Sequence, residues 1–293
     1  MDTFDGDAAA GANTRALTAA ETASRVPLTA DALASLVGEH AALSALAVTK
    51  ASPSTNTELL AALAAEPEAW PHMSALVADH QTAGRGRAGR EWNTPRGAAL
   101  TVSFVVRPGL DPERWGLVPL AVGLACVRAL RADGVHAMLK WPNDVVVPVE
   151  GHGVHGWGNL RKVAGILCER QDDAVVSGIG INVSQTLEEL PVPHAASLAT
   201  LGGHLDRRAL LDALARRLAE AIGETERDPD AFVAEVEAVT STLGQQVVVE
   251  RPGQPPLSGK AVGLGADGSL TIRTAVGEDV PVHAGDVRLR ATL

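Results

Sequence analysis

The sequence predicts a larger α+β domain followed by a small all-β domain. Over residues 41–242, apolar β-branched runs typical of buried strands alternate with amphipathic runs typical of helices. After Gly244 the pattern changes to short strands at regular spacing, separated by turn sequences such as ADG and GED. We therefore expect a flexible N-terminal extension with a short helix over 1–40, the α+β domain over 41–242 and a small β-barrel over 243–293.

The composition is that of a globular protein with a negative net charge. Of the 293 residues, 46% are hydrophobic, which is enough for a sizeable core. The formal net charge of −10 disfavours a general binder of nucleic acid or anionic membranes. Cys126 and Cys168 lie in apolar runs, which predicts small buried side chains and neither a disulfide nor a zinc site. Because the start lacks a signal segment and no apolar run approaches the ~20 residues that span a bilayer, we expect a cytoplasmic protein.

The first forty residues carry little structural signal. Residues 1–27 show no periodicity and are expected to form a mobile tail. Residues 28–39 predict a short amphipathic helix that begins near Thr29 or Asp31.

A strand and a capped helix open the larger domain. The strand is expected within 42–52, and Ser54 or Thr55 then precedes a helix with three leucines on one face. Glu58 lies three residues after Thr55, which predicts a capping box between these two side chains.

The remaining elements follow from the same patterns. Pro142–Asn143 interrupts a β run and predicts two short strands in place of one. The other predicted elements are strands at 75–79 and 97–108, a long helix at 112–134, a strand hairpin at 161–170 and 174–183, and amphipathic helices at 207–224 and 228–244.

A glycine–arginine loop, GRGRAGREW at 84–92, is the most distinctive stretch. Its first six residues fit the spacing of a dinucleotide-binding loop and nearly that of a P-loop, but both of those motifs must open a helix. Here a strand follows, and the P-loop lysine is absent. The alternatives that remain are a solvated basic surface loop and a loop that clamps an anion through Arg85, Arg87, Arg90 and Arg96.

Five motifs in order make the second alternative specific. The stretches STN (54–56), HQTAGRGRAGREW (80–92), KWPND (140–144), RKVAGIL (161–167) and GIGINV (178–183) resemble the biotin–protein ligases. The resemblance runs from about residue 44 to the C-terminus. It implies a class II aminoacyl-tRNA-synthetase-like catalytic domain, with a mixed or antiparallel sheet, and a C-terminal SH3-like barrel.

The resemblance also implies an activity. Biotin would attack the α-phosphate of ATP to give biotinyl-5′-AMP, and a lysine of a biotin carboxyl carrier protein or domain, from an acyl-CoA or pyruvate carboxylase, would then take the biotinyl group. Biotin, ATP and Mg²⁺ are the implied ligands. Positive side chains suit the transfer of a carboxylate onto a triphosphate.

Each motif carries expected site residues. Lys162, Arg87 and Asp144 are the expected catalytic residues, with Asp144 polarising the incoming lysine; the metal ligands are unknown. Trp92 could instead fill the core. The expected biotin contacts are Ser54, Thr55, Asn56, Gln81, Gly84, Arg85, Gly86, Arg87, Lys162 and Gly165. The expected nucleotide contacts are Arg87, Arg90, Trp92, Asn143, Asp144, Lys162 and Asn182.

Some features depart from the family pattern or leave alternatives open. The forty residues before the match are too short and too acidic for a DNA-binding module, so we expect no DNA partner and no membrane partner. An insertion lies between Asp144 and Lys162; its His152 and His155 lack further partners for a metal, so a surface insertion is expected. A lipoate–protein ligase or octanoyltransferase of the same fold is the nearest rival, and a nucleic-acid-binding module is a more distant one. The chain could be a monomer or a homodimer.

Overall fold

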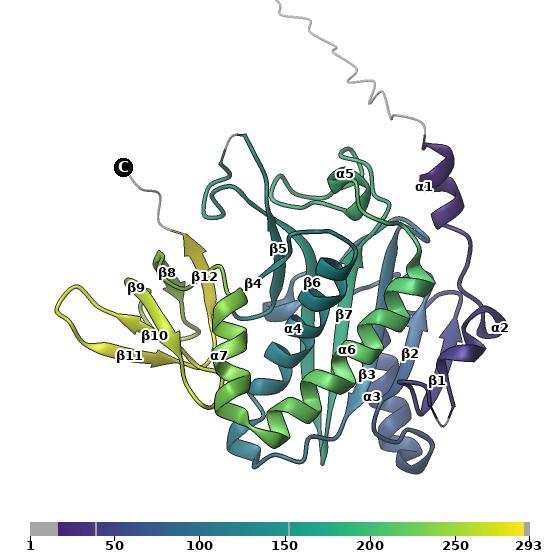
Figure 1. The fold of residues 1–293 in the computed structure, drawn as a ribbon, viewed down its shortest axis with the longest axis horizontal. Coiled ribbons are helices and arrows are strands. Elements are labelled where there is room, and N and C mark those ends of the chain that lie inside the picture. Colours follow the sequence, from purple (N-terminus) through teal and green to yellow (C-terminus); the bar gives the residue numbers. More distant parts are fainter. Residues whose placement is uncertain (1–16, 39, 152, 290–293) are drawn as a thin grey trace, which may run out of the picture.

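Two β-sheets organise the chain (Figure 1). The computed structural model describes residues 17–38, 40–151 and 153–289. The larger sheet has the strand order β1-β2-β3-β7-β6-β5-β4. Its strands are β1 (Ala45–Thr49), β2 (Ser74–Ala78), β3 (Ala99–Val106), β4 (Met138–Lys140), β5 (Asp144–Pro148), β6 (Leu160–Gln171) and β7 (Ala174–Asn182).

The larger sheet is mixed. β1 and β2 run parallel, whereas every other neighbouring pair is antiparallel. β6 and β7 form the predicted hairpin, and the chain turns between β4 and β5 at Trp141–Asn143, where the proline was expected to break the run. The α+β class predicted from the sequence is therefore confirmed.

Helices cover both faces of this sheet. On one face, α3 (Thr55–Ala65) packs Leu59 and Leu63 against Leu76, Val105 and Val176. On the other face lies the main core, covered by α4 (Leu117–Ala132), α6 (Arg207–Arg227) and α7 (Pro229–Val239), as Figure 1 shows. A four-residue helix, α5 (Leu198–Leu201), and short 3-10 turns complete this domain. Successive side chains of a strand point to opposite faces of the sheet, so neighbouring residues of one strand pack into different cores.

The central helix α4 is apolar on most of its surface because other elements surround it. Twelve of its sixteen residues are buried, including Gly123, which lies close to Leu139 of β4. The chain leaves α4 through Gly134, whose φ of +80° is a left-handed conformation that glycine adopts without strain. No helix in the described ranges combines the length and hydrophobicity needed to cross a membrane.

The C-terminal domain is a five-stranded antiparallel sheet in the order β11-β10-β9-β8-β12. Figure 1 shows it beside α7 and β4. Trp141 joins the domains, since its indole nitrogen donates to the Gly268 carbonyl at 3.0 Å. The strands are β8 (Gln246–Glu250), β9 (Leu257–Leu264), β10 (Leu270–Arg273), β11 (Asp279–Val282) and β12 (Asp286–Leu289).

The N-terminal segment departs from its prediction. Ala19–Ser24 forms helix α1 inside the expected mobile tail, and Thr18 and Glu21 cap it reciprocally. The helix expected over 28–39 is two short pieces, α2 (Ala30–Leu33), capped by Thr29, and a 3-10 turn at Ala34–Leu36. Helix α1 is too short for an amphipathic period to be read from the sequence, and the amphipathic pattern read over 28–39 is divided between two short pieces. Residues 1–16 of the predicted tail lie outside the described ranges.

Candidate active site

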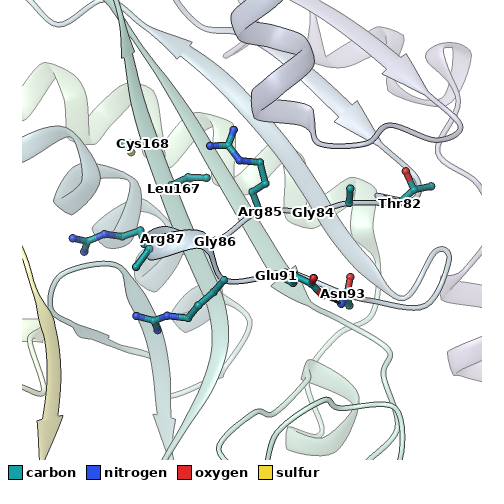
Figure 2. A pocket seen from close by; sticks show the side chains of 13 residues that line it. Thr82, Gly84, Arg85, Gly86, Arg87, Glu91, Asn93, Leu167 and Cys168 are labelled. Carbon is teal, nitrogen blue, oxygen red and sulfur yellow. Dashed lines mark hydrogen bonds between the residues drawn. The ribbon is translucent and has the colours of Figure 1, made fainter. Parts of the chain in front are cut away.

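A cavity of about 590 Å³ lies between the glycine–arginine loop, the start of α3, the β6–β7 hairpin and β12. The residues predicted to contact biotin or the nucleotide all line it except Gly84, although their motifs are spread over more than a hundred positions, whereas Arg96 of the predicted anion clamp is not among the lining residues. The predicted residues that line it are Ser54, Thr55, Asn56, Gln81, Arg85, Gly86, Arg87, Arg90, Trp92, Asn143, Asp144, Lys162, Gly165 and Asn182. Gly84 lines an adjoining recess of about 600 Å³ under the loop (Figure 2).

Buried hydroxyl and amide groups form one end of the cavity. The side-chain oxygen Oε1 of Gln81 accepts hydrogen bonds from the Thr55 backbone N–H at 2.8 Å and from the Thr55 hydroxyl at 3.1 Å. Ser103 of β3 donates to Asn56 Oδ1 at 2.6 Å, and Asn56 Nδ2 donates to the Leu167 carbonyl at 2.9 Å. These bonds fix the side chains, so that this end is a rigid polar surface.

This network also explains why the predicted capping box is absent. Ser54, not Thr55, is the N-cap of α3 and accepts from the Thr57 backbone N–H. Thr55 is already helical, and its hydroxyl interacts with Gln81 and Ser103. The capping box between Thr55 and Glu58 was therefore wrong, because the buried hydroxyl is held by the cavity lining.

Two lysines share one buried carboxylate in the middle of the cavity. Asp144 Oδ1 lies 2.6 Å from Lys162 Nζ, and Asp144 Oδ2 lies 3.9 Å from Lys140 Nζ. Burial alone would raise the pKa of Asp144, but the two lysines outweigh it and hold that pKa below its ordinary value. Burial lowers the pKa of Lys140, whose ammonium group also donates to the Val287 carbonyl at 2.8 Å.

Two asparagine side chains are held at the same place by their amide groups. Asn143 Nδ2 donates to the Ile166 carbonyl at 2.9 Å. Asn182 Nδ2 donates to the Ala196 carbonyl at 3.0 Å, while its Oδ1 accepts from Gln185. Both predicted residues therefore lie near Lys162, with side chains already oriented by the backbone.

The glycine–arginine loop folds back on itself across the cavity. Gly86 N–H donates to the Arg90 carbonyl at 2.7 Å, and Trp92 N–H donates to the Gly84 carbonyl at 2.8 Å. A side chain at Gly84 would collide with the Trp92 carbonyl, which accounts for that glycine. After a single 3-10 turn at Arg87–Gly89 the chain continues into β3. The strand–loop–strand context that excluded the dinucleotide and P-loop alternatives is present.

The arginines of this loop have different partners. Arg85 pairs with Glu169 at 2.8 Å, and Arg90 pairs with Asp286 of β12. Within the described ranges, Arg87 has only a long hydrogen bond of 3.5 Å to Asn143, and burial lowers its pKa. Figure 2 shows Arg85 and Arg87 leaving the loop in different directions. Arg87 is therefore the cation of the three that is not neutralised by a bonded carboxylate.

Trp92 lies flat on a glycine-lined part of the β6–β7 hairpin. A Cβ atom at Gly180 would come within 2.5 Å of the indole ring, and one at Gly165 within 3.3 Å. Lys162 Nζ lies 5.6 Å from the ring centroid. The indole N–H of Trp92 is buried without a hydrogen-bond acceptor in the described protein, so an acceptor on a ligand could satisfy it.

Sequence reasoning missed several residues of this cavity. His155 and Trp157 enter from the insertion, His194 from the segment after β7, and Asp286 and Arg288 from the C-terminal domain. The Trp157 and His194 rings stack with centroids 4.2 Å apart. No motif links these positions in the sequence. Among the features of the sequence, only the length of the insertion pointed to any of these residues.

The side chains that the structure describes do not form a complete magnesium site. In the described ranges, no group of three or more histidine, cysteine, aspartate or glutamate side chains could hold a metal ion. In the cavity, Asp144 is already paired with Lys162. Magnesium usually binds phosphate oxygens together with only one or two carboxylates, so any Mg²⁺ here would arrive with a nucleotide. His152, which was weighed above as a metal ligand together with His155, lies outside the described residues.

Comparisons with known proteins decide the family. The model of the Biotin/lipoate A/B protein ligase family matches residues 48–185, and the model of the Biotin protein ligase C terminal domain matches residues 242–290. The chain is 35% identical to the biotin–[acetyl-CoA-carboxylase] ligase of Mycobacterium tuberculosis over 86% of this chain and 91% of that protein. The chain belongs to the biotin protein ligase family. This confirms the ligase predicted from the motifs.

Solved structures agree with this assignment. A biotin protein ligase from Aquifex aeolicus, in complex with biotin and ATP, is 30% identical with a TM-score of 0.68, over 85% of this chain and all of that one. A Leishmania major ligase bound to biotinyl-5-AMP is 26% identical with a TM-score of 0.55, over 82% of this ligase and 99% of that one. The Escherichia coli ligase/repressor BirA is 30% identical, and this ligase covers 66% of it. The C-terminal domain and the named relatives favour a biotin ligase over the lipoate alternative.

Proposed function

We propose that this cavity forms biotinyl-5′-AMP from biotin and ATP and then transfers the biotinyl group to a lysine of a biotin carboxyl carrier domain. In the first step a biotin carboxylate oxygen attacks the α-phosphorus and pyrophosphate leaves. In the second, the lysine amine attacks the biotinyl carbonyl and AMP leaves. The observation that supports this most directly is the Lys162–Asp144 pair, which lies between a rigid polar end and an arginine loop.

The polar end would hold biotin. Ser54, Thr55, Asn56 and Gln81 present hydroxyl and amide groups that suit the ureido ring, and their hydrogen bonds keep them in place before the ligand arrives. The backbone at Gly84, Gly86 and Gly165, together with the Arg85 side chain, would border the remainder of biotin.

The charged end would hold the nucleotide. Lys162 would contact the reacting carboxylate and the α-phosphate, where negative charge grows in the transition state. Asn143 and Asn182 would position the adenylate, and Trp92 would offer an aromatic surface to its base. Arg87 and Arg90 would contact the phosphate groups.

Asp144 would act chiefly in the transfer step. Its carboxylate is ionised and already accepts a hydrogen bond from an ammonium group, that of Lys162. An incoming lysine must lose a proton to become a nucleophile, and a carboxylate at this place could orient and polarise its amine.

The proposed activity is tested by biotin-dependent exchange of labelled pyrophosphate into ATP. We expect exchange with biotin and none with lipoate or octanoate. Exchange with lipoate but not with biotin would replace the proposal by the lipoate-ligase alternative. Transfer is then measured as streptavidin-detectable label on a purified carrier domain.

We also propose the setting in which the enzyme acts. Its partner is a carrier domain of an acyl-CoA or pyruvate carboxylase, it works in the cytoplasm as a monomer or homodimer, and it does not bind operator DNA. Residues 41–242 serve as the catalytic domain and 243–293 as the small second domain. The separate large and small sheets and the negative net charge support these assignments.

Arg87→Gly is expected to release the intermediate early. Arg87 is the loop arginine without a carboxylate bonded to it, so it is free to bind an adenylate. Loss of one charge-assisted contact is worth ~1.5–3 kcal/mol, or roughly ten- to a hundredfold in affinity. The leaked mixed anhydride should label exposed lysines on bystander proteins, seen on a streptavidin blot. Label confined to the carrier domain, with adenylate release as slow as in the wild type, would contradict this role.

A further inference from the structure

Two parts of the chain that the family resemblance leaves unexplained contact the same segment. They are the N-terminal extension, residues 17–38, and the insertion, residues 149–159. Both meet residues 184–196, which follow β7 and which we name the pocket wall. The wall contributes Pro191, Val192, His194 and Ala195 to the lining of the cavity.

Arg25 of the extension holds the beginning of the wall. Its guanidinium donates to the Ser184 carbonyl at 2.7 Å and to the Ser184 hydroxyl at 3.1 Å. It also forms a two-pronged ion pair with Glu189, at 3.0 and 2.6 Å. Glu189 in turn accepts from the Thr186 N–H at 3.0 Å, and the Arg25 hydrogen bond is the largest cause that lowers the pKa of Glu189. Both partners are mostly buried, which strengthens such a pair.

The extension is itself anchored on both sides of Arg25. Arg207 of α6 donates to the carbonyls of Ser24 and Val26, at 3.1 and 2.7 Å, and pairs with the buried Asp79 at 2.9 Å. Arg207 therefore fixes the backbone on both sides of Arg25. Through Arg207, the contacts between Arg25 and the pocket wall are linked to the main core.

Trp157 of the insertion holds the other end of the wall. Its ring stacks on His194 at 4.2 Å with an interplanar angle of 13°, and Lys140 Nζ lies 4.4 Å from the Trp157 centroid. Burial lowers the pKa of His194, and Lys162 adds to this, so the stacked imidazole is neutral at pH 7. The insertion is in turn tied to β12, where Leu289 N–H donates to the Gly156 carbonyl at 3.0 Å.

The end of the pocket wall that Trp157 contacts runs beside Lys162. The Lys162 N–H donates to the His194 carbonyl at 2.6 Å, and the Ala196 N–H donates to the Lys162 carbonyl at 2.8 Å. The middle of the wall has little packing of its own, because Leu187 is 73% and Val192 39% exposed. A segment with so few buried apolar contacts depends for its order on the contacts made at its two ends.

We propose that Arg25 and Trp157 are positioning residues that keep the pocket wall in its closed place when the enzyme is empty, so that the nucleotide end of the cavity is preformed. This rests on the proposed function, which places the adenylate beside Lys162. A preformed wall removes the cost of ordering residues 184–196 when the nucleotide binds. Loss of either grip therefore weakens binding of ATP and leaves biotin, at the polar end, unaffected.

The test compares the wild type with Arg25→Ala, Trp157→Ala and the control Arg208→Ala. Arg208 also holds the extension, through the Ala32 carbonyl and the Ser35 hydroxyl, but does not touch the wall. For the first two variants we expect the KM for ATP to rise about tenfold, the loss expected for one charge-assisted or aromatic contact. For Arg25→Ala, which lies outside the cavity lining, the kcat and the KM for biotin should stay within about twofold of the wild type; Trp157 itself lines the cavity, so that variant is judged on the KM for ATP.

Conservative variants and hydrogen exchange distinguish a positioning role of Arg25 and Trp157 from a general loss of stability. Arg25→Lys and Trp157→Phe should recover part of the ATP affinity. The effects of Arg25→Ala and Glu189→Ala should be less than additive in the double variant, because the two residues share one ion pair while each keeps other partners, Ser184 and Thr186. Hydrogen exchange of the ligand-free proteins should show residues 184–196 protected in the wild type and in Arg208→Ala, and unprotected in Arg25→Ala.

Two results would overturn the proposal. One is equal protection of residues 184–196 in the wild type and in Arg25→Ala. The other is an unprotected wall without any change in the KM for ATP. A wild-type enzyme that lacks biotin-dependent pyrophosphate exchange would instead refute the proposed function. Hydrogen exchange needs no activity, so in that case it would still decide whether Arg25 grips the wall.

Discussion

Lys162→Ala is expected to lower the kcat of adenylate formation by about two or more orders of magnitude. Lys162 is the ammonium group that lies on Asp144 in the middle of the cavity, so it meets the negative charge that forms when a carboxylate attacks a phosphate. Alanine removes that charge stabilisation without filling the space. Single-turnover formation of biotinyl-5′-AMP measures the effect without the transfer step.

The same substitution should lower stability modestly. Asp144 loses its partner at 2.6 Å but keeps Lys140 at 3.9 Å, so the loss should be smaller than the ~3–5 kcal/mol typical of an unpaired buried charge. Lys260→Ala, at an exposed position of β9, is the matched control and should leave both properties unchanged. A Lys162→Ala enzyme with near-normal adenylation would show that the lysine is only a partner of Asp144.

Asp144→Asn is expected to affect stability more and to block the second half-reaction. The substitution leaves Lys140, only 4% exposed, without a carboxylate, and such a loss costs about 3–5 kcal/mol. Transfer from preformed adenylate to the carrier domain should fall more than adenylate formation does, because the incoming lysine loses the carboxylate that orients and polarises its amine. The control is Asp173→Asn, which removes an exposed carboxylate paired with Arg107. Equal losses in both half-reactions would contradict a specific role in transfer.

Asp144 also predicts how stability depends on acidity. Its folded-state pKa lies below the ordinary value of 3.8, so its contribution is complete above that value and is lost as the pH falls through the folded-state pKa. Asp144→Asn lacks this contribution at every pH. The difference in unfolding free energy between the two proteins should therefore shrink below about pH 4. Urea titrations of both proteins over that range measure it.

Local patterns predicted most of the fold because most elements have strong local signals. β3 is a continuous apolar run, the β6–β7 hairpin has apolar runs at the centre of both strands, and the break at Pro142–Asn143 needs only the chemistry of proline. Helix α1 has no apolar periodicity, since six residues do not complete two turns, and its one local signal is the capping box of Thr18 and Glu21. Its order comes from contacts of the extension with distant residues such as Arg207.

The candidate site, like the fold, has one part that local motifs predict and another that depends on contacts between distant parts of the sequence. Lys162 and Asp144 stand in ordered motifs, so the resemblance could place them in one cavity, and they are in contact there. The Arg25–Ser184 bond joins positions 159 residues apart, and no periodicity or spacing relates them. The stack of Trp157 on His194 is equally non-local.

The hydrogen bond from Lys140 to the Val287 carbonyl has a consequence for biosynthesis. Most of the residues that line the cavity precede position 200, yet the buried ammonium of Lys140 finds its carbonyl acceptor only in β12. On the ribosome, the nascent chain therefore carries an incomplete cleft until translation has passed Val287. We therefore expect chains that end before Val287 to form little adenylate, so that catalytic competence appears only when synthesis of the chain is nearly complete.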